Sequence, residues 1–248
     1  MNLYYSVVIP AYNEEMVIEN TVEKINSFLE SQNKSFEIIV ADDGSKDNTQ
    51  KIIEKMMFKY KNLRLVKNEI NSGRGAALTN AFKNANGDIL VYIDADFAID
   101  LDLFPKLMAA IETDNVDIAT GSKHLEDSIV DYPKLRRFFS KGYSFLTRLL
   151  LGSNVRDYQC GFKAFKRDAI LNILPYVKAK KWSWDTEVLV KAQWLGYKVK
   201  ELPAKVINVY GRESKVHLMK DIKTMGKELI RLFFERIRFN RNIPIDKP

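Results

Sequence analysis

Two aspartates separated by a single residue follow an apolar segment of this sequence. Asp94 and Asp96 come directly after Ile89–Ile93 (ILVYI), which has the length and composition of a buried strand. Residues i and i+2 of an extended segment point to the same side, so both carboxylates can share one cation. Mg²⁺ and Mn²⁺ prefer oxygen ligands and commonly link protein carboxylates to substrate phosphates. The pair therefore predicts a divalent cation, Mg²⁺ or Mn²⁺, although two solvated acids on a loop would give the same pattern.

Two further polar segments stand where a strand or a glycine-rich turn ends. Asp42–Ser45 (DDGS) follows Phe36–Ala41, and its carboxylates suit the N–H of a base or the hydroxyls of a ribose. Asp, Gly and Ser are also ordinary turn residues, which is the favoured interpretation of this segment alone. Asn71–Gly75 (NSGRG) places Arg74 at the start of a helix, where free N–H groups and the helix dipole attract anions. The glycine spacing fits neither a P-loop nor a dinucleotide-binding turn, which argues against a kinase or a dehydrogenase.

Predicted strands and helices alternate through the first 98 residues, and they must position these segments. Apolar runs of strand length alternate with segments of helical periodicity, which is typical of a parallel sheet covered on both faces. The predicted strands are Ser6–Pro10, Phe36–Ala41, Leu63–Val66 and Ile89–Ile93, and the predicted helices are Glu14–Glu30, Asp47–Tyr60 and Gly75–Asn84. Ligands of such sheets bind beyond the carboxyl ends of the strands. We therefore expect Pro10–Glu15, Asp42–Ser45 and Asp94–Asp96 to converge on one site.

The second half of the chain is less regular and strongly basic. Residues 133–248 hold 26 Lys and Arg against 10 Asp and Glu, whereas residues 1–132 hold 13 against 22. The predicted elements are a strand at Ile118–Gly121, a helix at Trp184–Leu195, short strands at Val199–Leu202 and Val206–Val209, and basic amphipathic segments at Lys134–Leu151 and Val216–Arg241. An acidic half joined to a basic half suggests two tasks, and the basic half would attract an anionic surface.

The two basic amphipathic segments bear on where the protein works. Such helices lie in a lipid interface and favour anionic lipids, while packing on the domain or in the seam of a homo-oligomer is an equally weighted alternative. From the sequence we expect no signal peptide and no spanning helix. The single cysteine, Cys160, allows no intrachain disulfide and fits a reducing compartment. We therefore expect a peripheral protein on the cytoplasmic face of a membrane.

Five short motifs, taken in order, carry a resemblance to a known family. They are VVIPAYNEE (Val7–Glu15), VADDGSKDNT (Val40–Thr49), NSGRGAAL (Asn71–Leu78), DADF (Asp94–Phe97) and GSK (Gly121–Lys123). Each is modest alone, but the five with this spacing resemble glycosyltransferase family 2. Within the family, Arg156–Phe165 (RDYQCGFKAF) and Lys181–Leu189 (KWSWDTEVL) look like the dolichyl-phosphate glucosyltransferase branch, with the related mannosyltransferases as the close alternative.

The resemblance implies a fold, a donor and a set of donor-binding residues. The fold is the glycosyltransferase A type, a Rossmann-like, mostly parallel sheet flanked by helices, here with C-terminal amphipathic helices. The donor is a nucleotide-diphosphate sugar, and the reaction is inverting. The residues implied in donor binding are Pro10, Ala11, Tyr12, Glu14, Asp42, Gly73, Arg74, Asp94, Ala95, Asp96, Lys123, Gln159, Arg212 and Lys215, with Asp94 and Asp96 as the metal ligands. Lys123 stands where many relatives have arginine, and Ala98 stands where some mannosyltransferases have a third metal ligand.

The acceptor implied by the resemblance is a polyprenyl phosphate. Arg136, Arg137 and Ser214 are expected at its phosphate, and Arg212 and Lys215 are expected to close over the phosphates and take part in catalysis with Asp96. Asp185 is expected to orient groups at the reacting centre, or to act as a base if the acceptor is a hydroxyl. A phosphate monoester is already anionic at neutral pH, since its second pKa is about 6, so it needs little help from a base.

The alternatives differ in the sugar, in the acceptor and in whether the protein is an enzyme. UDP-glucose is the first choice of donor and GDP-mannose the second, while a family 2 enzyme acting on a glycan hydroxyl is a further possibility. A non-enzymatic protein that binds anionic surfaces is the least favoured, and no nucleic-acid partner is expected because no zinc-ligand spacing or RNA-binding aromatic motif is present. The predicted division is a catalytic domain at 1–215, with a nucleotide-binding half at 1–98, an acceptor half at 99–215 that includes an interface segment at 133–152, and a basic helix at 216–248.

Overall fold

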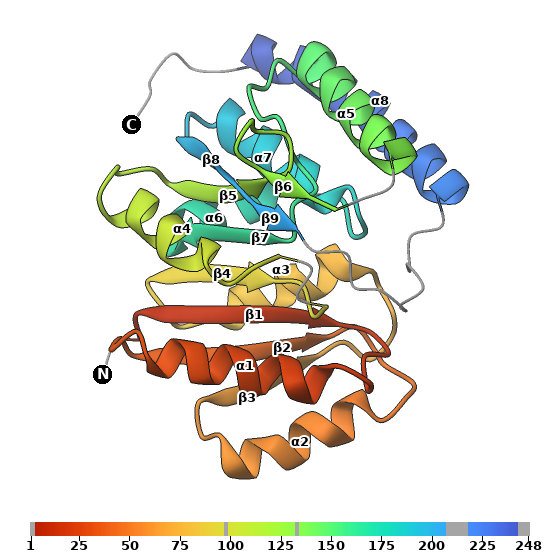
Figure 1. The fold of residues 1–248 in the computed structure, drawn as a ribbon. Coiled ribbons are helices and arrows are strands. Elements are labelled where there is room, and N and C mark those ends of the chain that lie inside the picture. Colours follow the sequence, from red (N-terminus) through yellow and green to blue (C-terminus); the bar gives the residue numbers. More distant parts are fainter. Residues whose placement is uncertain (1–2, 97–98, 132–133, 207–217, 243–248) are drawn as a thin grey trace.

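One seven-stranded sheet, in the order β3-β2-β1-β4-β7-β5-β8, organises the molecule, and β6 pairs with β9 beside it (Figure 1). The computed structural model describes residues 3–96, 99–131, 134–206 and 218–242. The strands are β1 (Tyr5–Ala11), β2 (Phe36–Asp42), β3 (Leu63–Lys67), β4 (Ile89–Ile93), β5 (Ile118–Ser122), β6 (Ile129–Val130), β7 (Phe162–Lys166), β8 (Val199–Pro203) and β9 (Lys205–Val206). The helices are α1 (Ile18–Glu30), α2 (Thr49–Lys59), α3 (Arg74–Asn84), α4 (Leu103–Glu112), α5 (Lys134–Leu151), α6 (Arg167–Ile173), α7 (Trp184–Trp194) and α8 (Leu218–Asn242), with a 3₁₀ turn at Leu174–Tyr176.

The first half of the sheet is parallel, as the sequence predicts. β1 lies between β2 and β4 and runs parallel to both, and β3 extends the sheet beyond β2. Every residue of β1 and β4 is buried, because helices cover both faces and leave no side of these strands to water. Continuous apolar runs such as SVVIP and ILVYI are therefore the expected composition. The predicted strand limits agree with the observed ones to within a residue or two.

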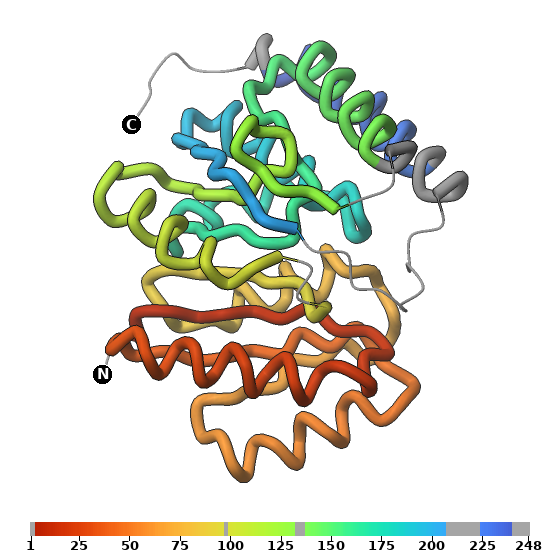
Figure 2. Tube along the Cα trace, viewed as in Figure 1, coloured from red at the N-terminus to blue at the C-terminus, as the bar shows by residue number. Residues whose placement is uncertain are grey.

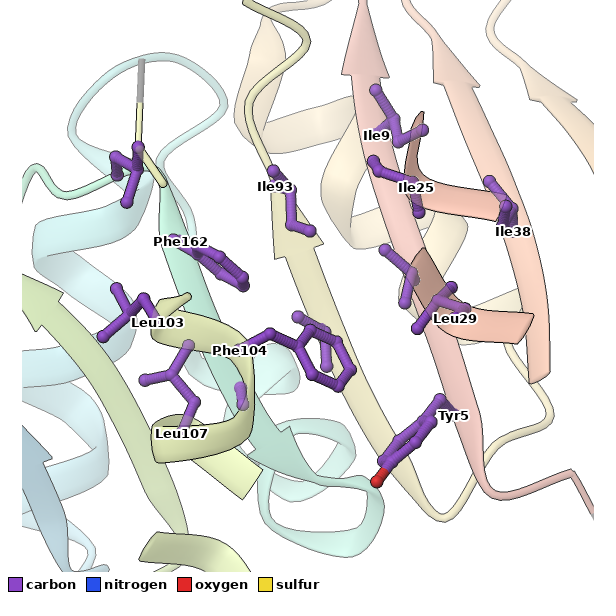
Figure 3. Packing of buried hydrophobic residues seen from close by; sticks show 14 of the residues in the cluster. Tyr5, Ile9, Ile25, Leu29, Ile38, Ile93, Leu103, Phe104, Leu107 and Phe162 are labelled. Carbon is purple, nitrogen blue, oxygen red and sulfur yellow. The ribbon is translucent and has the colours of Figure 1, made fainter. Parts of the chain in front are cut away.

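Two hydrophobic layers, one on each face, fix the sheet. Residues of α1, α2 and α4 pack on one face, and residues of α3, α6 and α7 pack on the other. Figure 3 shows Ile25 and Leu29 of α1 lying against Ile9 and Ile38 in the first of these layers. In the same layer the ring of Phe104 from α4 lies 6.3 Å from that of Phe162 on β7. The core thus continues from the first half of the chain into the second.

Strand β7 was not predicted from the sequence, and neither were helices α4 and α6. β7 runs antiparallel to both of its neighbours, β4 and β5. Its sequence, Phe162–Lys166 (FKAFK), has charged residues at its second and last positions and so lacks the continuous apolar character used to recognise the other strands. The pairing sets Gly161, just before β7, beside Asp94, just after β4, whose N–H donates to the Gly161 carbonyl at 3.0 Å. An element missed by the sequence analysis therefore places the predicted metal ligand.

The two basic amphipathic segments form helices α5 and α8, which lie side by side at one end of the molecule (Figures 1 and 2). Leu229 and Leu232 of α8 are buried against the domain, whereas Ile230 and Phe234 are exposed. Among the described residues, no helix is long and apolar enough to cross a membrane. The predicted strand at Val206–Val209 is observed only in part, as β9, because residues 207–209 lie outside the described residues.

Candidate active site

The loops after β1 and β2 are joined by hydrogen bonds into a single surface. The N–H of Asn13 donates to Ser45 Oγ at 2.9 Å, and the N–H of Lys46 donates to Asn13 Oδ1 at 2.8 Å. Asn13 has a φ of 52°, a left-handed conformation that asparagine adopts more readily than most residues. One residue on, the N–H of Glu14 donates to Thr49 Oγ1 at 2.8 Å. The convergence expected for Pro10–Glu15 and Asp42–Ser45 is therefore observed.

Asp42 is buried, and its own loop occupies its carboxylate. Oδ2 accepts hydrogen bonds from the N–H groups of Gly44 and Ser45 at 3.1 and 3.0 Å and from Gln50 Nε2 at 2.6 Å. Oδ1 accepts a hydrogen bond from the Ser45 hydroxyl. These bonds build the turn, which agrees with the turn interpretation of this segment. Of the neighbouring candidates, Pro10, Ala11 and Ala95 have buried side chains, while Tyr12 and Glu14 are partly exposed.

Asp43, which was predicted only as part of the DDGS segment, fixes the start of α3. Its Oδ1 accepts the N–H of Ser72 at 3.0 Å, and its Oδ2 accepts the N–H of Gly73 at 2.7 Å. Gly73 has a φ of 106°, and a Cβ there would lie 2.4 Å from the carbonyl oxygen of Lys180, so only glycine fits. The two acids of DDGS therefore have different structural roles. Asp42 shapes its own loop, and Asp43 positions the residue before Arg74.

Arg74 joins three parts of the chain that are distant in sequence. One guanidinium nitrogen donates to Asp94 Oδ1 after β4, and the other donates to Asp185 Oδ2 on α7 at 2.5 Å. The guanidinium also lies 5.0 Å from the ring of Tyr92 and 5.5 Å from that of Trp182. Although burial alone would lower the pKa of Arg74, the carboxylates of Asp94 and Asp185 raise it well above its ordinary value. A permanently charged guanidinium thus stands at the carboxyl end of the sheet, where an anionic ligand would bind.

Asp185 is buried and shared among cations. Besides Arg74, its carboxylate accepts hydrogen bonds from Lys163 Nζ at 2.7 Å and from the Tyr92 hydroxyl. Burial alone would raise the pKa of Asp185, but the charges of Lys163 and Arg74 bring it below its ordinary value. A carboxylate held ionised in this way is a poor proton acceptor. Of the two roles left open by the sequence, this geometry favours orienting Arg74 over acting as a base.

Asp94 and Asp96 offer carboxylate oxygens, the kind of ligand that Mg²⁺ and Mn²⁺ prefer. Burial raises the pKa of Asp94, and the negative charges of Asp96 and Asp185 raise it further, against the opposing effect of Arg74. Carboxylates that repel each other in this way would be stabilised by a shared cation. A Cβ at Gly161 would lie 1.7 Å from Asp94 Oδ2, so this glycine makes the room that the carboxylate occupies. Among the described residues, no group of three metal-binding side chains is found.

Lys123 and Gln159 lie in a neighbouring cluster around buried Asp157. Lys123 Nζ is 2.8 Å from Asp157 Oδ2, and Gln159 Nε2 donates to Thr186 Oγ1 at 3.1 Å. Burial alone would raise the pKa of Asp157, but the positive charge of Lys123 brings it below its ordinary value. The cluster therefore links the end of β5 to the residue that follows Asp185.

The structure describes only some of the residues expected at the acceptor phosphate. Arg137 is exposed on α5. The side chain of Arg136 and the whole of Arg212, Ser214 and Lys215 lie outside the described residues. Their expected roles therefore stay predictions.

The order of motifs and the fold agree with a family model. The model of glycosyl transferase family 2 matches residues 6–174, more than half of the chain. This chain belongs to glycosyltransferase family 2. The match runs from β1 to the start of the 3₁₀ turn, and so includes Arg74, Asp94 and Lys163 but not Asp185.

Family 2 relatives cover nearly all of this chain. Glycosyltransferase AglD of Haloferax volcanii is 40% identical over 247 residues, which is 97% of this chain but 39% of that protein. Dolichyl-phosphate beta-glucosyltransferase of Dictyostelium discoideum is 32% identical and aligns with 94% of this chain and 75% of that protein. The chain therefore spans well under half of the archaeal relative and three quarters of the other.

A solved structure shares the fold of this family 2 chain. Glucosyl-3-phosphoglycerate synthase of Mycobacterium tuberculosis, in complex with Mn²⁺, uridine diphosphate and phosphoglyceric acid, superposes with a TM-score of 0.68. It is 22% identical, and the alignment covers 98% of this chain and 80% of that one. The predicted fold class, a mostly parallel sheet of the glycosyltransferase A type, is confirmed.

Proposed function

We propose that this chain is an inverting, cation-dependent hexosyltransferase that moves glucose from UDP-glucose to dolichyl phosphate or another polyprenyl phosphate. The observation that carries the proposal is the meeting of Arg74 with Asp94 at the carboxyl end of β4, beside Asp96. It occurs in a chain whose family 2 relatives, over more than nine tenths of its length, include proteins named dolichyl-phosphate beta-glucosyltransferase. The name of the archaeal relative gives neither a sugar nor an acceptor.

The donor would lie across the loops that end β1, β2 and β4. The partly exposed Tyr12 and Glu14 would face its base and ribose, and Arg74 would face its diphosphate. Mn²⁺ or Mg²⁺, held by Asp94 and Asp96, would neutralise charge on the departing diphosphate. The structures with this fold that contain UDP together with Mn²⁺ or Mg²⁺ support this choice of donor and cation.

The reaction would exchange one bond at the anomeric carbon of the sugar. An acceptor phosphate oxygen forms the new bond to that carbon while the bond to the diphosphate oxygen breaks, and the nucleoside diphosphate leaves. Because the acceptor oxygen is already ionised at neutral pH, no proton has to be removed. The task of the protein is then positioning, in which Asp185 holds Arg74 in place and the joined loops hold the nucleoside.

The acceptor would reach the site from a membrane surface. Phe138, Phe145 and Leu149 are exposed on α5, and Ile230 and Phe234 are exposed on the neighbouring α8. The same two helices also expose five cations: Arg137, Lys141, Arg148, Lys227 and Arg238. Helices that expose both apolar and positively charged side chains suit an anionic lipid surface, whereas the like charges of a second copy would repel. A peripheral position on the cytoplasmic face and the division of the chain at residues 98 and 215 are parts of this proposal.

The test is sugar transfer from labelled donors by the purified chain. UDP-glucose, GDP-mannose and UDP-N-acetylglucosamine are each incubated with polyprenyl phosphate or with the matching polyprenol, in detergent and Mn²⁺. The proposal predicts label in the lipid product from UDP-glucose and polyprenyl phosphate alone. Transfer from GDP-mannose would replace the sugar, and transfer to the alcohol would replace the acceptor. Absence of lipid-linked label with every donor would contradict the proposal.

A further inference from the structure

Lys163 is a fully buried lysine beneath the candidate site. It lies on β7 with no exposed surface, on the sheet face that also carries Tyr92 and Phe165 and on which Trp184 of α7 packs. Removing an ammonium group from water costs several kcal/mol, and an apolar residue at this position would avoid that cost. Lys163 lies within the RDYQCGFKAF motif, but neither that motif nor the proposed contacts with the donor give its side chain a role.

The ammonium of Lys163 is surrounded by oxygen atoms from three elements. Its Nζ is 2.7 Å from Asp185 Oδ1 on α7, 2.9 Å from the Tyr92 hydroxyl on β4, and 2.5 Å from the Cys160 carbonyl. The carbonyl of Tyr158 lies 3.1 Å away. The loop at residues 158–161 thus rests on this ammonium, and the same loop hydrogen-bonds Asp94 through the Gly161 carbonyl. Lys163 therefore contacts both Asp185 and the loop that holds Asp94.

The two oxygens of Asp185 have separate partners. Lys163 and the Tyr92 hydroxyl hold Oδ1 on the buried side, so Oδ2 is turned toward Arg74, 2.5 Å from its guanidinium. Arg74 in turn reaches Asp94. A continuous line of charged contacts therefore runs from the core to the proposed metal ligand, and Lys163 is its inner end.

We propose that Lys163 is a positioning residue for glycosyl transfer, which fixes Asp185 and through it holds Arg74 at Asp94. This inference rests on the proposed function and adds to it a residue that does not touch the substrates. Since Arg74 would face the donor diphosphate, a small misplacement of its guanidinium would slow transfer while the loops continue to bind the nucleotide.

The first test compares Lys163→Met with Lys191→Met. Lys191 is a matched control because it is also buried and also pairs with a carboxylate, Glu235, at 2.7 Å, but on the side facing α8. We expect Lys163→Met to lower kcat by about 10²-fold while calorimetry still gives one UDP per chain in the presence of Mn²⁺. Lys191→Met is expected to keep kcat within about twofold. A kcat loss matched by an equal loss of binding-competent protein would overturn the proposal, as would an unchanged kcat.

Two further measurements keep the test independent of folding and of turnover. In ¹⁵N-arginine-labelled protein, the guanidinium signals assigned by Arg74→Lys should be sharp in the wild type and lost in Lys163→Met; unchanged signals would contradict the proposal even if no acceptor were turned over. If Lys163→Met fails to fold, Asp185→Asn is compared with the Lys163→Met, Asp185→Asn double variant, which leaves no unpaired buried carboxylate. Equal kcat values for the two variants would support the proposal that Lys163 acts through Asp185. A further tenfold loss of kcat in the double variant would overturn it.

Discussion

The two halves of the sheet hold their site residues in different ways. In the parallel half, loops are fixed by neutral donors on nearby carboxylates and amides, as at Asp42, Asp43 and Asn13. In the half that contains β7, the site residues are held by buried ion pairs, Lys163 with Asp185 and Lys123 with Asp157. The first arrangement shapes a backbone surface for a ligand, and the second fixes charges. Arg74 is where the two meet.

The largest effect is expected from removing a carboxylate contributed by the parallel half. Asp96→Ala should lower transfer by about 10³-fold, because the proposed cation would lose one of its two protein ligands. Asp96 is only partly buried in a loop, so the fold should persist. Initial rates and Mn²⁺ binding measure the effect. The exposed Asp127→Ala is the control, and Mn²⁺-dependent transfer by Asp96→Ala at the wild-type rate would show that the pair is not a metal site.

A second large effect concerns the attachment of α8 to the second half. Leu232→Ala removes a side chain that is 1% exposed and should lower the free energy of unfolding by about 3 kcal/mol. Ile230→Ala, at a residue 58% exposed on the same helix, should change it by less than about 0.5 kcal/mol. Urea titration followed by circular dichroism measures both. Equal effects would mean that α8 is not packed on the domain as described.

The exposed face of α5 and α8 is the part of the molecule that we propose to contact lipid, whereas no such contact is proposed for the parallel half. Phe145→Glu combined with Phe234→Glu should weaken binding to vesicles with anionic lipid by at least about tenfold, since two apolar contacts become charges repelled by the surface. Co-sedimentation with vesicles measures this. Phe58→Glu, at a residue 81% exposed on α2, is the control and should bind as the wild type does. A double variant that still binds would argue against this face.

The smallest expected effect is on the stability of the fold at acidic pH. Burial alone would raise the pKa of Glu235, but hydrogen bonds from Lys191 and Lys178 lower it from 4.5 to about 2. A carboxyl with a lowered pKa in the folded state stabilises the fold above its unfolded pKa, and this contribution is lost as the pH falls from about 4.5 to about 2. In Glu235→Gln, Tm should therefore fall less steeply over this pH range than in the wild type. The difference corresponds to about 1 kcal/mol or less in the free energy of unfolding. An unchanged slope would exclude Glu235 as its source.

Much of the parallel half could be predicted because its signals are local. Buried strands between two helical layers are continuously apolar, and the residues after them must lie at one edge of the sheet. The placement of Asp94 at the same edge as the loops after β1 and β2 followed from this, whereas Arg74 was expected at the nucleotide from the family resemblance. The role of Asp43 at the start of α3 was missed because its partners, the N–H groups of Ser72 and Gly73, lie about thirty residues away and leave no mark on its own segment.

The ion pairs of the second half could not be predicted in the same way. Lys163 stands between Phe162 and Ala164, and a charged residue inside so short a segment is typical of a strand with one face in water. Its partners, Tyr92 and Asp185, come from distant elements, so only the fold brings them together. The signal that was present is the lysine itself, flanked by aromatic residues on a segment that must enter the core. The amphipathic character of the segment that forms α8 could be predicted from its sequence, and its residues Leu229 and Leu232 are buried.

A double-mutant cycle between Arg74→Met and Asp185→Asn measures whether the two halves of the sheet build one site through Arg74. Initial rates of glucose transfer from UDP-glucose to polyprenyl phosphate are measured for the wild type, both single variants and the double variant, at saturating Mn²⁺. Strong non-additivity is expected, with a coupling free energy of about 2 kcal/mol, because each change removes the same contact. Losses that add to within about 0.5 kcal/mol would show that the two residues act independently and that the halves are not joined through Arg74.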